Sequence, residues 1–336
     1  MTFLIQQTVI YAVPLMLVAL AGVFAERSGI VNLALEGIMI IGAFTGVLFI
    51  NIMQNGGAFT KDNAMTLMLL TMVICALAGI LFSLLLSFAS VNLQANQTIS
   101  GTALNLLAPA IVLFLINLIA NQNVLSMAEG DASTWFMIRK KALGFDTGKD
   151  YGFFLETFFF KNYPADYICI LIFVLLSIIL YKTRFGLRLR ACGENPHAAD
   201  SLGINVRKMR YLGTGISGAL ASTGGFVFAL TTANASSTGD VAGFGFLALA
   251  VMIFGNWKPL NIAAASLLFG VFKCIAAAYS TLDLNGDGNF LLAQAGISTN
   301  FYRMLPYLIT LLVLAFTSKN SRAPKAAGFP YDKGKR

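Results

Sequence analysis

The chain has 336 residues, of which 57% are hydrophobic and 11% are charged, and its formal net charge is +8. The charged share is about half that of an ordinary soluble domain. This excludes a water-soluble fold, because no such fold hides so much apolar surface, and we expect an all-α integral membrane protein.

Apolar stretches long enough to cross a bilayer recur along the chain, since a spanning helix needs roughly 20 residues for about 30 Å of hydrocarbon. The first stretch has no Lys or Arg before Arg27 and no clear cleavage site, so it predicts a span rather than a signal peptide. We expect about nine transmembrane helices, within a range of eight to ten, at 3–24, 29–51, 64–90, 98–120, 165–182, 211–231, 242–256, 260–280 and 303–318.

Thirteen of the 23 basic residues fall in two blocks, 182–210 and 319–336, each beside a hydrophobic segment. This placement is typical of cytoplasmic loops under the positive-inside rule and speaks against nucleic acid as a partner. It predicts that Arg190 and Lys325 are cytoplasmic and that the N-terminus lies outside. The predicted organisation is a transmembrane domain (1–318) made of a first half (1–120), an external loop (121–164) and a second half (165–318), followed by a basic cytoplasmic tail (319–336).

Two segments, 29–42 and 243–255, share a Leu-Ala-Leu string and flanking glycines that align within one residue. In the predicted topology they run in opposite directions, as expected of an inverted internal repeat. Such repeats commonly build a substrate path near the membrane midplane. The alternative is chance, because short Gly/Ala/Leu strings are common wherever membrane helices pack.

Glu36 lies within an apolar run, with Asn32 one helical turn earlier on the same face. A carboxylate inside the membrane costs roughly 3 kcal/mol and faces a polar cavity or a partner. The sequence leaves two interpretations open: a pathway or gating residue, or a structural carboxylate tied to a neighbouring helix.

The fourth predicted span opens with an unusual density of amides and hydroxyls over 96–105. Amides both donate and accept, so they suit the hydroxyls of a ribose or the edge of a base. Hydrogen bonding between helices explains the same residues without a ligand. With Glu36 and Asn32, the predicted substrate path comprises Asn32, Glu36, Gln97, Thr102 and Asn105.

The segment 186–203 is polar, basic and punctuated by glycine and proline. Asn195 precedes Pro196, an arrangement in which Asn caps a helix and Pro occupies its first turn. We therefore predict a short cytoplasmic docking helix, with a solvated linker as the alternative.

Three strings carry a resemblance to a known family: Glu26-Arg-Ser-Gly-Ile-Val-Asn-Leu-Ala-Leu-Glu-Gly37, the segment 186–203, and Gly243-Phe-Gly-Phe followed by Gly255. They resemble the branched-chain amino acid, ribose and nucleoside permeases of ATP-binding-cassette importers, most of all the nucleoside and simple-sugar branch. Here Asn256-Trp257 follows Gly255, where family members often carry an ionisable residue. The resemblance implies that a coupling segment within 184–210 seats in the ATPase, through Gly193, Glu194, Asn195, Pro196, Ala198, Ala199 and Gly203.

Other chemistry finds little support in the sequence. There is no Gly-x4-Gly-Lys-Ser/Thr pattern, so ATP hydrolysis is expected on a separate subunit. His197 is the only histidine and the four cysteines lack metal-ligand spacing, so neither a metal site nor an intramembrane catalytic site is expected. The string at 283–288 matches the start of a calcium loop, but Gln294 stands where a bidentate Glu is needed, which favours a polar external turn.

The resemblance implies a multi-pass permease of the bacterial cell membrane that moves nucleosides or simple sugars by alternating access. Implied partners are an ATPase that binds ATP and Mg, a second permease, identical or different, and an extracytoplasmic substrate-binding protein or lipoprotein. The chain itself is expected to bind no cofactor. The alternatives are a branched-chain amino acid permease and an ion-coupled carrier in which Glu36 is the coupling site.

Overall fold

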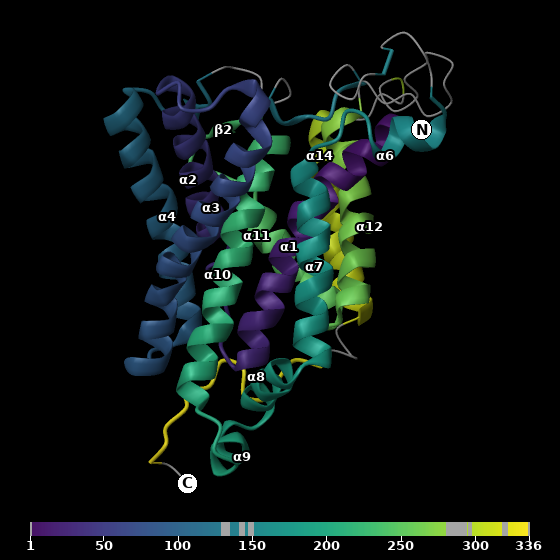
Figure 1. The fold of residues 1–336 in the computed structure, drawn as a ribbon. Coiled ribbons are helices and arrows are strands. Elements are labelled where there is room, and N and C mark those ends of the chain that lie inside the picture. The colour runs from purple at the N-terminus through teal and green to yellow at the C-terminus, as the bar shows by residue number, and fades with distance from the viewer. Residues whose placement is uncertain are drawn as a thin grey trace.

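The computed structural model describes residues 2–128, 135–140, 145–146, 151–279, 294, 298–317 and 322–334. They form an upright bundle of helices (Figure 1). The long helices are α1 (Thr2–Ser28), α2 (Leu35–Asn55), α3 (Ala64–Ser87), α4 (Gln97–Ala120), α7 (Pro164–Lys182), α10 (Val206–Thr231), α12 (Pro259–Ala278) and α14 (Thr299–Thr317). The shorter helices are α6 (Phe153–Phe158), α8 (Arg184–Glu194), α9 (Pro196–Ser201) and α11 (Phe244–Phe254), with a 3-10 turn at Lys61–Asn63 and a π-helical turn at Phe88–Asn92.

Within the described residues, seven helices are long and apolar enough to cross a membrane. The predicted all-α membrane protein is therefore confirmed. The predicted span 242–256 is shorter than expected, because α11 has 11 residues and rises only about 16 Å, half the hydrocarbon thickness. The ninth predicted span corresponds to α14, which has 19 residues.

The described parts of the two basic blocks lie at one end of the bundle. The amide of Ala326 in the tail donates to the carbonyl of Gly193 at the end of α8, over 2.8 Å. The N-terminus lies at the opposite end (Figure 1). This agrees with the predicted arrangement of the ends, and which side of the membrane each end faces stays a prediction.

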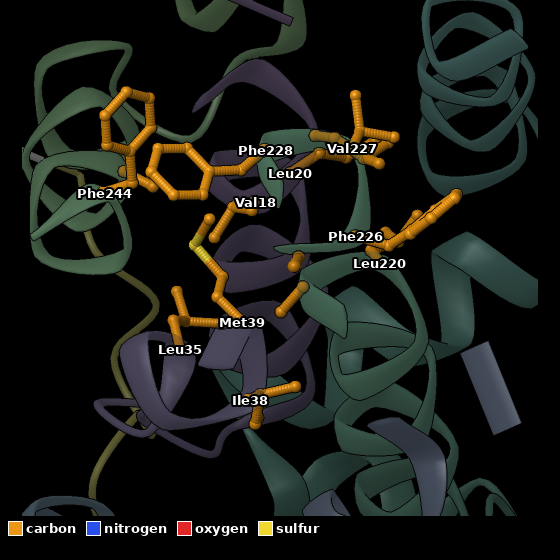
Figure 2. Packing of buried hydrophobic residues seen from close by; sticks show 14 of the residues in the cluster. Val18, Leu20, Leu35, Ile38, Met39, Leu220, Phe226, Val227, Phe228 and Phe244 are labelled. Carbon is orange, nitrogen blue, oxygen red and sulfur yellow. The ribbon is translucent and has the colours of Figure 1, made fainter. Parts of the chain in front are cut away.

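Two helices form the centre of the fold, because α1 and α10 bury most of their residues while α4 buries few. Figure 2 shows where their side chains meet those of α2 and α11. Val18 and Leu20 of α1 lie beside Phe228 of α10 and Met39 of α2. All of these side chains are buried, so α1 and α10 are the elements against which the others are positioned.

Small residues let α10 approach its neighbours closely. A Cβ on Gly218 would lie 2.3 Å from the carbonyl oxygen of Gly79 on α3, and one on Gly225 would lie 2.0 Å from the carbonyl oxygen of Met39 on α2. Contacts this close require glycine, because any larger residue meets backbone rather than a movable side chain. Membrane helices pack through such small residues, since lipid supplies no hydrophobic drive between them.

At the end that carries the N-terminus, two short strands, β1 (Leu125–Ser126) and β2 (Ser236–Ser237), pair antiparallel with Leu125 opposite Ser237. They join the loop after α4 to the loop after α10. Nearby, the side chain of Gln6 on α1 donates to the carbonyls of Glu156 and Phe160, which ties α6 to the bundle. The string at 283–288 lies outside the described residues.

Candidate functional site

A non-helical segment separates α1 from α2, although the sequence predicted one helix over 29–51. Gly29 follows the end of α1 with φ +98°, a left-handed conformation that commonly terminates helices at glycine. The side-chain oxygen of Asn32 accepts from the amide of Ala34 over 3.1 Å, a local turn that competes with helix. The chain therefore crosses 29–34 as a compact turn, and α2 begins at Leu35.

Three of the predicted path residues hold this turn in place. The Nδ2 of Asn32 donates to Ser217 Oγ on α10 over 2.9 Å, and Gln97 Oε1 accepts from the amide of Val31 over 2.8 Å. Asn105 bonds both sides of the turn: its Nδ2 donates to the Leu33 carbonyl over 2.6 Å and its Oδ1 accepts from the Gly37 amide over 2.8 Å. In this conformation, the amides of the fourth span therefore replace helix hydrogen bonds that the turn has lost.

Glu36 joins the turn to α11. One carboxylate oxygen accepts from the amide of Gly243 over 3.0 Å, and the other accepts from the amides of Gly245 and Phe246 over 2.6 and 3.2 Å. These are amides of the first turn of α11, which have no partner within the helix. A negative charge also suits the positive end of a helix dipole. Of the two interpretations left open for Glu36, its tie to a neighbouring element is observed, and a gating role stays a prediction.

The contact between Glu36 and Gly245 requires the absence of a side chain. A Cβ on Gly245 would lie 2.4 Å from the backbone nitrogen of Glu36. From this point α2 runs toward the end where Asn51 donates to the carbonyl of Ser126, while α11 runs toward the other end. The two predicted copies thus begin side by side and diverge, as an inverted repeat requires; the repeat itself stays a prediction.

The far end of α11 is anchored by the residues that depart from the family pattern. The indole nitrogen of Trp257 donates to the carboxylate of Glu26 over 2.7 Å, near the end of α1. Asn256 Oδ1 accepts from the amide of Arg322 in the tail over 2.8 Å. The missing ionisable residue is therefore replaced by an indole and an amide, each with a specific partner.

Thr102 does not join the other predicted path residues. It lies on the exposed face of α4, and its hydroxyl donates to the carbonyls of Thr98 and Ile99 in the same helix.

A pocket of about 470 Å³ opens beside the start of α11, outside the predicted substrate path. Lys273 of α12 contributes to its wall, with its Nζ 4.6 Å from the ring centroid of Phe244 and 5.5 Å from that of Tyr307. Lys273 is the one charged residue within the predicted span 260–280. A charged side chain inside the membrane is costly, so Lys273, like Glu36, could have been identified from the sequence as a candidate. The rings around it could not, because they are brought together only by folding.

The predicted short helix after Asn195 is present as α9, and its docking role stays a prediction. Asn195 caps it, with Oδ1 accepting from the amide of Ala198 over 3.1 Å, and Pro196 occupies the first turn. Ala199 is buried beneath the helix, and Gly203 ends the segment with φ +79°. The segment is therefore an ordered structure rather than a linker.

This segment is attached to the central helix α1. Glu194 forms an ion pair with Arg27 near the end of α1, with 3.2 Å between Oε1 and Nη1. A Cβ on Gly193 would lie 2.4 Å from the carbonyl oxygen of Arg27, so α8 and α1 touch through backbone. The segment is therefore joined to α1 by an ion pair and by a backbone contact.

The tail covers the same region. The fully buried Arg210 of α10 donates from Nη1 to the carbonyl of Phe329 over 3.0 Å, and the ring of Tyr331 lies 5.3 Å from that of His197 on α9. Tail, docking helix and α10 thus form one layer. Within the described residues, no group of His, Cys, Asp or Glu is arranged to hold a metal ion.

A bundle of apolar helices with a half-length helix that starts inside it, and an ordered polar layer at one end, defines a multi-pass membrane protein. The chain belongs to the family described as branched-chain amino acid transport system / permease component, whose model matches residues 4–314. No solved structure matches the chain.

Three relatives bear on the function. The guanosine ABC transporter permease NupQ of Bacillus subtilis (strain 168) is 38% identical over 336 residues, 100% of this chain and 98% of the relative. The nucleoside ABC transporter permease NupC of Lactococcus lactis subsp. cremoris (strain MG1363) is also 38% identical, over 99% of this chain and 97% of the relative. A second permease of B. subtilis (strain 168), the guanosine permease NupP, is 26% identical over 81% of this chain and 73% of the relative.

Proposed function

We propose that this chain is the membrane permease subunit of an ATP-driven importer of nucleosides. The observation that carries the proposal is the full-length similarity to permeases named for guanosine and for nucleosides. The match to NupQ extends over 100% of this chain, so it spans the turn at 29–34, α11 and the docking helix. The proposed substrates are therefore nucleosides, although the family description names branched-chain amino acids.

Energy is supplied at the polar layer. We infer that a separate ATPase, which binds ATP and Mg, receives α9 in a surface cleft. Asn195 and Pro196 fix the start of this helix, and the Glu194–Arg27 ion pair together with the glycine contact at Gly193 joins it to α1. Closure of the ATPase pair would then push on α9 and move α1 as a rigid element. In this arrangement the end with α9 and the tail is cytoplasmic.

Alternating access would take place where α2 and α11 begin. Glu36 bridges the two units that the sequence predicts to be an inverted repeat, and its three backbone bonds hold the closed contact. When α1 moves, these bonds would be the ones exchanged, because both units meet there through one side chain. Rocking of repeat units about a midplane contact is the usual form of such transport.

The second permease is proposed to be a different chain. B. subtilis (strain 168) has two guanosine permeases, and this chain is more similar to one of them than to the other, 38% against 26%. A heterodimer would bring two different docking segments to the ATPases. A substrate-binding protein or lipoprotein would deliver the nucleoside at the end that carries the N-terminus.

Uptake of radiolabelled substrates in cells that lack this chain would test the proposal. Loss of guanosine uptake, restored by a plasmid copy, supports it. Loss of leucine uptake with normal guanosine uptake would instead assign the chain to branched-chain amino acids. Uptake that persists without any ATPase would favour the ion-coupled carrier.

A further inference from the structure

We infer that the pocket beside α11 is where the permease holds the nucleoside during transport, with the base against Phe244 and Tyr307 and with Lys273 supplying polar contacts. The inference rests on the proposed function and names its binding site. It is carried by an aromatic pocket that contains a lysine within a membrane-spanning helix.

The pocket has the shape and chemistry for a flat, uncharged ligand. Its volume of about 470 Å³ lies within the range of about 300–1,000 Å³ found for small-molecule sites. Phe228 and Phe244 are buried with ring centroids 4.6 Å apart, and Tyr11 lies 6.4 Å from Phe244 (Figure 2 shows the first pair). Tyr307 also lines the pocket and is 50% exposed, so its ring is available for stacking.

Polar groups occupy one edge of this aromatic pocket. Lys273 has its ammonium group over two rings, and its remaining contact is a long one, 3.4 Å to the carbonyl of Ala242. Its three donors suit the carbonyl and ring nitrogens of a base or the oxygens of a ribose.

The position of the pocket links binding to the moving contact. Phe244 is the first residue of α11, and the amides of the residues on either side of it, Gly243 and Gly245, bond Glu36. A ligand held against Phe244 would therefore lie next to the place where α2 and α11 meet. Displacement of α11 would open or compress the pocket directly.

Two other hollows lack the combination of several aromatic rings with a lysine from a membrane-spanning helix. A hollow of about 830 Å³ beside α4 is lined by Leu113, Phe114, Asn117, Leu118, Asn123, Val124 and Thr238, none of which is ionisable. A hollow of about 550 Å³ at the other end is lined by Asp200, Arg207, Tyr331 and neighbours, and it belongs to the polar layer that we assign to the ATPase.

The test uses the complete transporter in proteoliposomes, with saturating guanosine-loaded binding protein outside and ATP at the ATPase side. Tyr307→Leu removes a stacking surface and Lys273→Met removes the ammonium group at nearly constant length. Each is expected to lower the rate of radiolabelled guanosine uptake about tenfold, Tyr307→Leu through the loss of one base-stacking contact and Lys273→Met through the loss of a hydrogen bond from a charged donor. Photolabelling with 8-azidoguanosine should mark peptides of α12 or α14 in the wild type and much less in Tyr307→Leu.

Matched controls separate this site from general damage. Phe301→Leu changes an equally exposed ring on the same helix as Tyr307, 45% exposed, and Lys258→Met changes an exposed lysine at the start of α12. Both should transport guanosine at the wild-type rate. Wild-type rates and labelling in Tyr307→Leu and Lys273→Met would overturn the binding site. A wild-type complex that moves no guanosine would overturn the proposed function, which is a distinguishable result.

Discussion

The carboxylate of Glu36 lies 2.6 Å from the amide nitrogen of Gly245, although the two residues are 209 positions apart in the chain. With Gly243 and Phe246, three amides of α11 depend on this one side chain. An unpartnered buried amide costs about 1–3 kcal/mol.

We therefore expect Glu36→Leu to lower the unfolding temperature of the purified protein by at least about 5 °C. Glu36→Gln keeps one oxygen acceptor and should lie between this variant and the wild type. Fluorescence-detected thermal unfolding in detergent measures both. Equal stability of Glu36→Leu and the wild type would show that the bonds to α11 contribute nothing.

Asn105 and Thr102 both belong to the predicted substrate path, but their contacts differ. Asn105→Leu loses both bonds across the turn at 29–34, to Leu33 and Gly37, and should reduce nucleoside uptake at least about tenfold while the complex still assembles. Thr102→Val loses bonds only to its own helix and should transport normally. Initial uptake rates, normalised to complex purified from the membrane, measure both. Normal uptake by Asn105→Leu would show that the bonds of Asn105 to the turn at 29–34 are not needed for transport.

The crossing of α3 and α10 should tolerate one glycine substitution and reject another three residues away. Gly218→Ala forces Cβ toward the carbonyl oxygen of Gly79, 2.3 Å away, whereas Gly215→Ala meets only Ile80 Cγ2 at 4.0 Å. Alanine favours helix over glycine by about 1 kcal/mol at either site. Gly215→Ala should therefore be neutral or stabilising, and Gly218→Ala should lower yield and unfolding temperature. Equal yields and equal unfolding temperatures of the two variants would show that the close contact at Gly218 does not limit the packing of α10 against α3.

The docking helix can be tested without disturbing the membrane core. The double change Glu194→Ala and Asn195→Ala removes the ion pair to Arg27 and the cap of α9, and a lost cap costs about 1 kcal/mol. We expect insertion to be normal and the stimulation of ATP hydrolysis by the loaded binding protein to be lost. Asn195→Ser restores a capping oxygen and should behave as the wild type. If the double variant keeps stimulated hydrolysis and transport, α9 is not the coupling element.

Cysteine labelling would determine which side the ends face. Arg188→Cys in α8 and Lys325→Cys in the tail should resist a membrane-impermeant maleimide on intact cells, whereas Asn123→Cys at the opposite end should react. The native cysteines give little background because all four are buried, and burial raises the pKa of Cys192 in α8 to about 11, which keeps its thiol protonated at pH 7. Labelling of Arg188→Cys on intact cells would show that α8 faces the outside, the opposite of the predicted topology.

The sequence by itself determined the features whose cause is local. Apolar runs fixed the helices and their membrane class, since each residue in a bilayer must suit lipid regardless of its distant neighbours. Asn195 and Pro196 predicted the start of α9, because a cap and its amides lie within one turn of each other. The family strings predicted the family that the comparison with known proteins confirms.

Only the tertiary structure decided what the polar residues inside the bundle contact. A charged residue in an apolar run predicts that a partner exists, but it does not identify that partner. Glu36 bonds Gly245, and Asn105 bonds Leu33 and Gly37, across chain separations that no local pattern encodes. The break at 29–34 was hidden for the same reason, since its lost helix bonds are replaced by side chains from α4. Lys273 was visible as a charge, whereas the rings around it come from separate helices and meet only because α1 and α10 hold those helices together.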